Sequence, residues 1–293
     1  MTFSAILFTL LSAVCHASWN LLSKSRGVDP TAFLRRALWY SMLLYAPLFF
    51  AAQFWIVYTP IYLLLALFSG ICTGLFFFFL ARAYQSGDVS FAYPVSRAFP
   101  ILVVTWAGLF LGELPGCMAL IGIVLIVAGC FFLPISSLRS DLTAGHFFNS
   151  CSGWALLSAL VISIASVLDK YAAIRMPSDE GASGIITRVA YVYLQNTVSF
   201  AVMVLATRKM IAGGTPVRRS RAIAAGILFL ISYSLIIFAF SRGKAGYIVS
   251  LRQLSIVLTT LLSMFFLEKK FSPFRLAGVL VITAGIMLVA LER

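Results

Sequence analysis

The sequence predicts an all-α integral membrane protein with ten transmembrane helices, arranged as two inverted five-helix repeats. Of the 293 residues, 61% are hydrophobic and only 11% are charged, less than half the charged share of a soluble domain. The apolar residues fall into ten stretches, each close to the roughly 20 residues that a membrane-spanning helix needs. In addition, the two halves of the chain align with each other.

The ten apolar stretches are separated mostly by short loops. The first stretch has no Lys or Arg before it, so it lacks the basic start of a cleaved signal peptide and is predicted to be a transmembrane helix. The longest polar segment, 136–151, is predicted to link a first repeat, 1–135, to a second, 152–293. The predicted spans are 3–23, 32–55, 61–82, 89–112, 117–135, 152–172, 185–207, 222–241, 246–267 and 274–291.

The first span carries its polar residues on one helix face. Ser12, His16, Trp19 and Asn20 follow a helical spacing, and a polar face on a lipid-surrounded helix is expected to point inward. His16 is the one side chain inside a predicted span that titrates near neutral pH in water. Two roles stay open for it: a proton carrier, or a buried neutral imidazole held by hydrogen bonds.

The fourth span contains Arg97 between Pro94 and Pro100, with Tyr93 on the same face as the arginine. The prolines remove backbone hydrogen bonds, so the helix is expected to bend or to leave carbonyls free beside Arg97. The ninth span has no proline at the matching place. The two halves are therefore not expected to be equivalent there.

The fifth and tenth spans each carry two glycines seven residues apart, which places them on one helix face. The pairs are Gly122 with Gly129 and Gly278 with Gly285. Small residues let helices approach closely, so these faces predict helix packing, with a contact between the two halves as one arrangement.

The sixth and seventh spans add polar groups from the second half. Tyr191 and Gln195 share a face of the seventh span. Asp169 and Lys170 lie near the end of the sixth span, where a helix-end salt bridge is favoured over a proton site. None of the nine acidic residues is expected at mid-depth of the membrane.

An internal repeat relates the two halves. Shifts of 146, 155 and 156 residues align the first half with the second in order, and the matches include identical charged residues. An odd number of spans per repeat turns the second copy upside down, which is typical of transporters. The matched residues include Lys24 with Lys170, Arg97 with Arg252, Glu113 with Glu268 and Gly122 with Gly278.

Arg97 and Arg252 are the two basic residues that lie inside predicted spans. An arginine at membrane depth costs roughly 2.5–3.5 kcal/mol or more, and such residues usually line a cavity or pathway. With no acid expected nearby, an anionic substrate, helix-end carbonyls or water must satisfy them. A site for a carboxylate, phosphate or phosphonate and a snorkelling or carbonyl-bonded arginine both remain open.

Several classes of protein are excluded by the same residues. The net charge of +13 comes mainly from loops between apolar runs, which indicates membrane topology and anionic lipid as a partner and not nucleic acid. The five cysteines have no metal-ligand spacing and are predicted to be free thiols. No cofactor, metal site or catalytic group is predicted, because the few acids and histidines are scattered.

Several motifs resemble the EamA group of the drug/metabolite transporter superfamily. In each half the fourth span closes on a Glu and the fifth carries Leu-x-Gly-x6-Gly, although the second Glu motif lacks the usual Gly. The resemblance covers essentially the whole chain and implies that four helices of each half surround a central cavity, with the fifth outside it. The other motifs are His16-Ala-Ser-Trp19-Asn20, Tyr93-Pro94-Val-Ser-Arg97 and Leu251-Arg252-Gln253-x-Ser255.

The resemblance and the inward polar residues predict a secondary transporter of a small anionic or zwitterionic metabolite, such as an amino acid, organic acid or phosphonate. A coupling proton or counter-substrate is a further expected partner. The alternatives are an exporter of hydrophobic or aromatic compounds, a lipid flippase and, least favoured, a membrane-embedded enzyme. The predicted substrate-binding residues are His16, Trp19, Asn20, Tyr93, Arg97, Tyr191, Gln195, Arg252 and Gln253.

The protein is expected in the inner or plasma membrane as a multi-pass protein, but two indications of its orientation disagree. The positive-inside rule places the side with more basic residues in the cytoplasm, which leaves both termini outside. The family resemblance implies cytoplasmic termini. The charge count is dominated by Arg208, Lys209, Arg218, Arg219 and Arg221.

Overall fold

The computed structural model of the chain describes residues 1–23, 29–87, 89–133, 135, 149–177, 181–208, 217–266 and 273–292. For residues 89–91, 93 and 263–266 the description covers the backbone alone. Most of the predicted linker, 136–148, lies outside the described residues, as do Lys24 and Glu268 of the repeat alignment. All regular secondary structure in the described ranges is helical.

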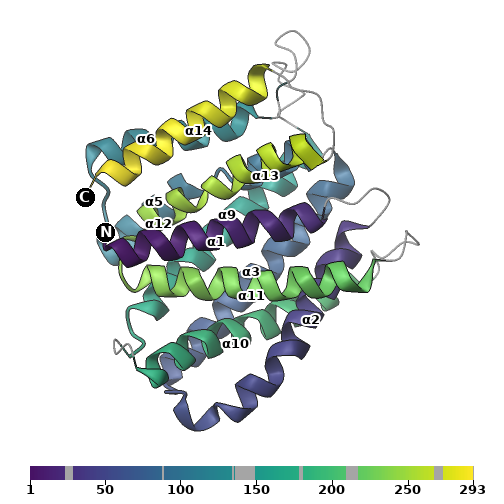
Figure 1. Cartoon of the computed structure of the whole chain (residues 1–293), viewed down its shortest axis with the longest axis vertical. Coiled ribbons are helices and arrows are strands. Elements are labelled where there is room, and N and C mark those ends of the chain that lie inside the picture. Colours follow the sequence, from purple (N-terminus) through teal and green to yellow (C-terminus); the bar gives the residue numbers. More distant parts are fainter. Residues whose placement is uncertain are drawn as a thin grey trace.

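Ten helical segments in the described ranges correspond to the predicted spans, with bounds that agree within a few residues (Figure 1). In the first half they are α1 (Phe3–Ser23), α2 (Pro30–Ala51) with the short 3-10 turn η1 (Gln53–Trp55), α3 (Pro60–Ser86), α4 (Val89–Ser96) with α5 (Pro100–Leu111), and α6 (Cys117–Phe132). In the second half they are α9 (Ser150–Ala173), α10 (Ala182–Ala206), α11 (Arg219–Phe240), α12 (Ala245–Arg252) with α13 (Leu254–Phe266), and α14 (Pro273–Leu291).

Local sequence explains where α2 and α3 begin. The side chain of Asp29 accepts a hydrogen bond from Thr31 N at 2.8 Å, and that of Thr59 accepts one from Tyr62 N at 3.2 Å. Each capping residue is followed by a proline, which suits the first helical position because the amide hydrogen there has no partner within the helix.

The fourth and ninth spans are both broken, whereas the prolines predicted an interruption in the fourth alone. In the fourth, α4 ends before Arg97 and α5 starts at Pro100, as the prolines indicate. In the ninth, the side-chain amide of Gln253 donates to the Val249 carbonyl at 3.1 Å, and the backbone N–H of Gln253 bonds instead to Ser250 O. A side chain thus takes the acceptor that a regular helix would use, which breaks the helix without a proline.

The glycine faces of α6 and α14 pack against each other, which confirms the packing prediction. A Cβ added to Gly122 would lie 2.6 Å from Gly285 O, and one added to Gly278 would lie 3.2 Å from Gly129 O. Gly122 contacts Gly285 and Gly129 contacts Gly278, so residue numbers rise along α6 where they fall along α14. These equivalent helices therefore run antiparallel, as inverted repeats require. They lie side by side at one edge of the molecule (Figure 1).

The other helices of the two repeats interleave. α3 packs against α9, and its counterpart α11 packs against α1, the counterpart of α9. In the same way α2 contacts α11, and α10 contacts α3. Each repeat therefore packs largely against the other, so the polar groups on the inward helix faces come from both repeats.

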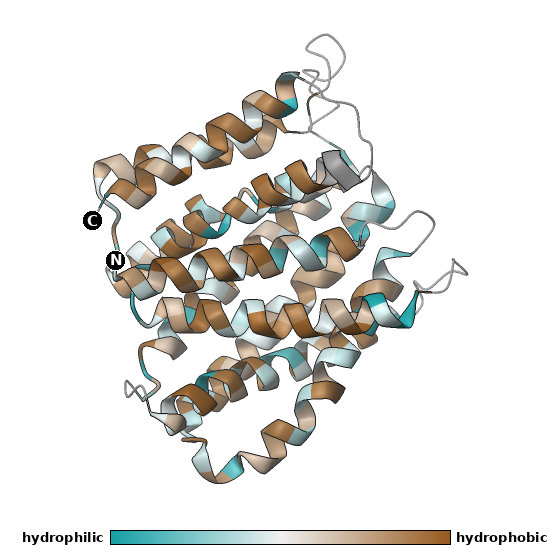
Figure 2. Ribbon diagram, viewed as in Figure 1, coloured by the Kyte–Doolittle hydropathy of each residue, from teal (hydrophilic) through white to brown (hydrophobic). Residues whose placement is uncertain are grey.

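The outer surface is suited to lipid. Large apolar side chains such as Leu109, Phe110 and Leu280 are exposed, and hydrophilic residues gather at helix ends, notably at the start of α11 (Figure 2). Among the described helices, eight are long and apolar enough to cross a membrane, and α6 is a shorter apolar helix. With α2, they make the ten spans of a multi-pass membrane protein.

Candidate functional site

Arg252 is the last residue of α12 and meets groups from α1 and α11. Its Nη2 atom lies 3.3 Å from Nδ1 of His16 and donates to Oγ of Ser232 at 3.2 Å. The guanidinium also lies 4.8 Å from the centre of the Tyr233 ring. The C-terminal end of a helix favours a cation, so the break after Arg252 also stabilises its charge.

His16 is held as a neutral imidazole. Its Nδ1 atom accepts a hydrogen bond from Nε1 of Trp19 at 3.2 Å, and the second group close to Nδ1 is the guanidinium of Arg252. An indole N–H and a guanidinium can only donate, so Nδ1 must be an acceptor and the ring proton must be on Nε2. Arg97 and Arg252 are both within electrostatic range of the ring. Of the two roles left open by the sequence, this geometry favours the neutral one.

Arg97 follows α4 directly, at the position equivalent to Arg252. Its side chain is 2% exposed, and the Phe99 ring lies 5.1 Å from the guanidinium carbon. Within the described part of the chain, Nε and Nη2 of Arg97 have no hydrogen-bond partner. A buried guanidinium with unpartnered N–H groups can bind an anion. We call Arg97, Arg252, His16, Trp19, Ser232 and Tyr233 the arginine cluster.

A second polar group surrounds Asp169, whose side chain is 4% exposed. Its Oδ1 atom accepts hydrogen bonds from Ser69 Oγ at 2.5 Å, Tyr191 OH at 2.9 Å and Gln195 Nε2 at 3.0 Å. Gln195 Nε2 also lies 3.1 Å from Oδ2 and 2.7 Å from Ser69 Oγ. We call these four residues the Asp169 cluster. The cluster lies next to the middle of α10, so Asp169 lies inside the bundle, although the sequence placed it only near the end of a span.

The predicted salt bridge at Asp169 is also wrong, because the neighbouring lysine pairs elsewhere. Nζ of Lys170 lies 3.1 Å from Oε1 of Glu113 and donates to the carbonyls of Phe240 at 2.7 Å and Gly243 at 2.9 Å. Consecutive residues on a helix point about 100° apart, so Lys170 reaches Glu113 and the end of α11 while Asp169 reaches α3 and α10.

The structure places the predicted site residues in two groups. His16, Trp19, Arg97 and Arg252 belong to the arginine cluster, and Tyr191 and Gln195 to the Asp169 cluster. Tyr233, beside Arg252, is within electrostatic range of Asp169 as well.

The remaining predicted site residues, Asn20, Gln253 and Tyr93, belong to neither cluster. The Asn20 amide donates to His16 O at 2.8 Å within its own helix. Gln253 is buried, and its Oε1 has no partner among the described residues. The side chain of Tyr93 lies outside the described residues.

Sequence reasoning did not single out Ser69 or Ser232, and it favoured a helix-end salt bridge for Asp169 over an interior role. A lone serine in an apolar run carries little signal, because most such residues only bond their own helix. Asp169 is four residues from the end of α9, and the interleaving of the repeats, which brings the middle of α10 to that depth, is not visible in the sequence.

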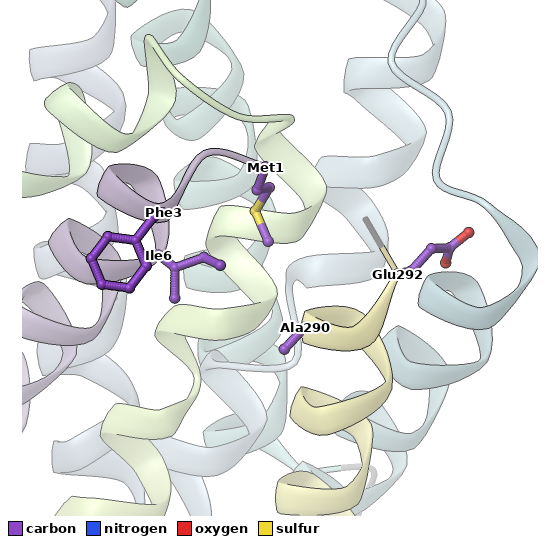
Figure 3. Close-up of a pocket in the computed structure, with 5 residues that line it drawn as sticks. All are labelled: Met1, Phe3, Ile6, Ala290 and Glu292. Atoms are coloured by element: carbon purple, nitrogen blue, oxygen red, sulfur yellow. The ribbon is translucent and has the colours of Figure 1, made fainter.

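A pocket of about 220 Å³ lies apart from both clusters (Figure 3). Its lining includes Met1, Phe3 and Ile6 at the start of α1 and Ala290 and Glu292 at the end of α14. The carboxylate of Glu292 turns away from Met1 and accepts a hydrogen bond from Ala119 N at the start of α6. Glu292 therefore caps a helix, and the pocket contains none of the predicted site residues.

The sequence profile of the EamA-like transporter family matches residues 3–134 and 149–291, one match in each half. The chain belongs to the EamA-like transporter family. Membership makes it a multi-pass membrane transporter of the drug/metabolite transporter superfamily, in agreement with the sequence motifs. No curated protein matches the chain.

A solved structure has the same fold as this EamA member. Its title reads "Crystal structure of protein", and it superposes with a TM-score of 0.76 at 18% identity, over 99% of this chain and 98% of that chain. At this level of identity the similarity concerns the fold.

Proposed function

We propose that this EamA-family protein is a secondary transporter that moves a small anionic or zwitterionic metabolite across the cytoplasmic membrane by alternating access. The observation that carries the proposal is the guanidinium of Arg97, buried in the bundle with Nε and Nη2 unpartnered among the described residues. Leaving such a group buried costs several kcal/mol, so a compensating function is expected.

The chemistry of the two arginines indicates the substrate class. A guanidinium is planar and always charged, and its paired N–H groups match the two oxygens of a carboxylate, phosphate or phosphonate. Arg97 and Arg252 occupy equivalent positions in the two repeats and both act on His16. A single anionic group held between them would bridge the repeats.

The position of the arginines supports alternating access. Both lie where a spanning helix is interrupted, and discontinuous helices near the interface of inverted repeats commonly form transporter substrate sites. Because the repeats interleave, rocking one against the other changes the surroundings of both guanidinium groups.

Thermal stabilisation of the detergent-purified protein tests the substrate class. The panel consists of succinate, glutamate, alanine, 2-aminoethylphosphonate, the cation tetraphenylphosphonium and the neutral aromatic compound indole. A compound that binds the folded protein raises its Tm by mass action. We expect a shift with an anion or zwitterion, and loss of about 2 kcal/mol of binding, roughly thirtyfold in affinity, in Arg97→Gln or Arg252→Gln.

Arg175→Gln is the matched control, because Arg175 is exposed and packs on the Tyr171 ring. It should leave the shift unchanged. Uptake of the stabilising compound into liposomes then follows for the same three variants. Normal uptake by both Arg97→Gln and Arg252→Gln would refute the anion site.

A second candidate function is export of aromatic or hydrophobic compounds. It is favoured by an aromatic cluster beside Arg252, in which the Phe229 ring lies 4.7 Å from Tyr233, 5.3 Å from Phe77 and 6.0 Å from Trp19 between ring centres. Stabilisation by indole or tetraphenylphosphonium alone, unchanged in Arg97→Gln, would support this function over the first.

A further inference from the structure

The two oxygens of Asp169 have different surroundings. Oδ1 accepts hydrogen bonds from Ser69, Tyr191 and Gln195, whereas among the described residues Oδ2 has one partner, Gln195 at 3.1 Å. Amide N–H groups only donate, and the Ser69 hydroxyl itself accepts from Gln195, so its proton points to Asp169. This arrangement is that of an ionised carboxylate whose Oδ2 atom can still accept a proton.

No cation within the described part of the chain forms an ion pair with Asp169, because Lys170 pairs with Glu113. The charged and titratable groups in electrostatic range are Cys72 on α3, Tyr191 on α10, Tyr233 on α11 and Arg252 on α12. Of the other helices packed on α9, α5 carries no titratable residue, and α4 carries Tyr93, whose side chain lies outside the described residues. The carboxylate is thus stabilised mainly by neutral donors.

The Asp169 cluster also joins the two repeats. Ser69 comes from α3 in the first repeat, while Asp169, Tyr191 and Gln195 come from α9 and α10 in the second. The hydroxyl of Ser69 at 2.5 Å from Oδ1 is therefore a hydrogen bond between the repeats whose strength depends on the charge of Asp169.

We propose that Asp169 is a proton-binding site of the transport cycle, which takes up a proton on Oδ2 and releases it as the repeats rearrange. The proposal rests on the transporter function proposed above and adds a coupling ion to it. The proton comes from water on the side to which the site opens, forms an O–H bond with Oδ2, and leaves to water on the other side.

Protonation changes the contact between the repeats. A carboxylate accepts stronger hydrogen bonds than a carboxylic acid, so the added proton weakens the bond from Ser69 to Oδ1. The new O–H group also turns Oδ2 into a donor, which opposes the contact from the Gln195 amide. The α3–α9 interface is thereby less tightly held in the protonated state, and proton binding favours movement of one repeat against the other.

Infrared difference spectroscopy of the full-length protein in liposomes, recorded as the pH is changed, tests this without any substrate. Protonation of a carboxylate gives a carbonyl stretch, and a carboxyl group in a dry interior gives it at a higher frequency than one in water. We expect one such high-frequency band in the wild type and its loss in Asp169→Asn. Asp29→Asn is the matched control, because Asn caps a helix as well as Asp does, and it should keep the band.

Two further variants guard against a merely structural effect. Ser69→Ala and Gln195→Leu each remove a donor and keep the acid, so the band should persist and appear at a different pH. An unchanged band in Asp169→Asn, or no such band in the folded wild type, overturns the proposal. A band that is lost in Asp169→Asn but unmoved in both donor variants also overturns it, because the Asp169 cluster would then not control the proton.

The infrared and thermal-shift experiments fail independently. A missing interior carboxyl band leaves the anion-binding arginines untouched. Absence of any stabilising anion or zwitterion refutes the substrate proposal while the infrared band still reports on Asp169.

Discussion

Nζ of Lys170 lies 3.1 Å from Oε1 of Glu113, and this ion pair joins the first helix of the second repeat to the end of the fourth span of the first. The other oxygen of Glu113 accepts a hydrogen bond from Ala245 N at 2.7 Å, at the start of α12. The lysine also donates to the carbonyl of Phe240, the last residue of α11, and to that of Gly243 in the loop that follows. One small network therefore connects α9, the end of the fourth span and the connection between α11 and α12 at one face of the molecule.

Loss of the Glu113 charge should destabilise the protein. Glu113→Gln leaves the Lys170 ammonium buried without its counter-ion, and breaking such a pair costs about 3 kcal/mol. Thermal unfolding in detergent should show a clearly lower Tm. The double variant Glu113→Gln/Lys170→Met should recover part of the loss, and a double variant as unstable as the sum of both changes would contradict this explanation.

A methyl group at the α6–α14 contact should separate the two helices. In Gly122→Ala the new Cβ would meet Gly285 O at 2.6 Å, and a backbone oxygen inside a packed helix has no free space to move into. We expect a loss of about 1–3 kcal/mol in the free energy of unfolding.

Gly153→Ala is the control for that change. No atom lies within 4 Å of the added Cβ at Gly153, which is also helical, so this variant should gain about 0.5–1 kcal/mol from helix propensity. Equal Tm changes for Gly122→Ala and Gly153→Ala would show that the glycine contact does not hold α6 against α14.

The two buried arginines should respond in opposite ways to removal of their charge. Arg97→Met removes a guanidinium with unpartnered nitrogens and should raise the Tm of the ligand-free protein, with loss of anion binding. Arg252→Met removes bonds to His16 and Ser232 and should lower it. Thermal unfolding without ligand measures both, and a lower Tm in Arg97→Met would indicate that the arginine is structural.

Removal of the hydrogen bond between Ser69 and Asp169 should cost about 1.5–3 kcal/mol, the usual range for a bond to a charged group. Ser86→Ala is a control on the same helix, because the Ser86 hydroxyl is exposed and bonds only to Arg82 O. Comparison of the Tm of Ser69→Ala and Ser86→Ala in detergent tests the difference. Similar values would mean that Asp169 finds another donor at little cost.

The basic cluster at the start of α11 predicts the orientation of the protein. Both termini lie at one face of the molecule and the start of α11 at the other (Figure 1). If Arg218, Arg219 and Arg221 remain in the cytoplasm, both termini are outside. A C-terminal alkaline phosphatase fusion should then be active, whereas a fluorescent C-terminal green fluorescent protein fusion would support the orientation that the family resemblance implies.

Apolar patterning was sufficient to predict the ten spans. The bounds of α1 agree at both ends, because lipid requires about 20 apolar residues and loops cannot remain inside the membrane. The match of Arg97 with Arg252 also predicted that both arginines occupy equivalent places. The glycine pairs predicted helix contact, since few other functions explain small residues at that spacing.

Two features depend on contacts that a single sequence does not reveal. The break at Gln253 comes from a side-chain amide that competes for the Val249 carbonyl, whereas most glutamines within helices leave the backbone intact. The depth of Asp169 depends on how α9 and α10 each pack against α3, which a single sequence does not define. For these reasons the sequence analysis placed no acidic residue near Arg97 and Arg252.

The contact between Gly122 and Gly285 has a consequence for experiments on the moving protein. The repeat alignment exchanges the contact of Gly122 with Gly285 and that of Gly129 with Gly278, so the crossing of α6 and α14 lies on the axis that relates the repeats. An exchange of conformations between the repeats therefore maps this crossing onto itself. A probe pair placed across the α6–α14 crossing should therefore keep a constant distance while others change. It provides a fixed reference point within each molecule.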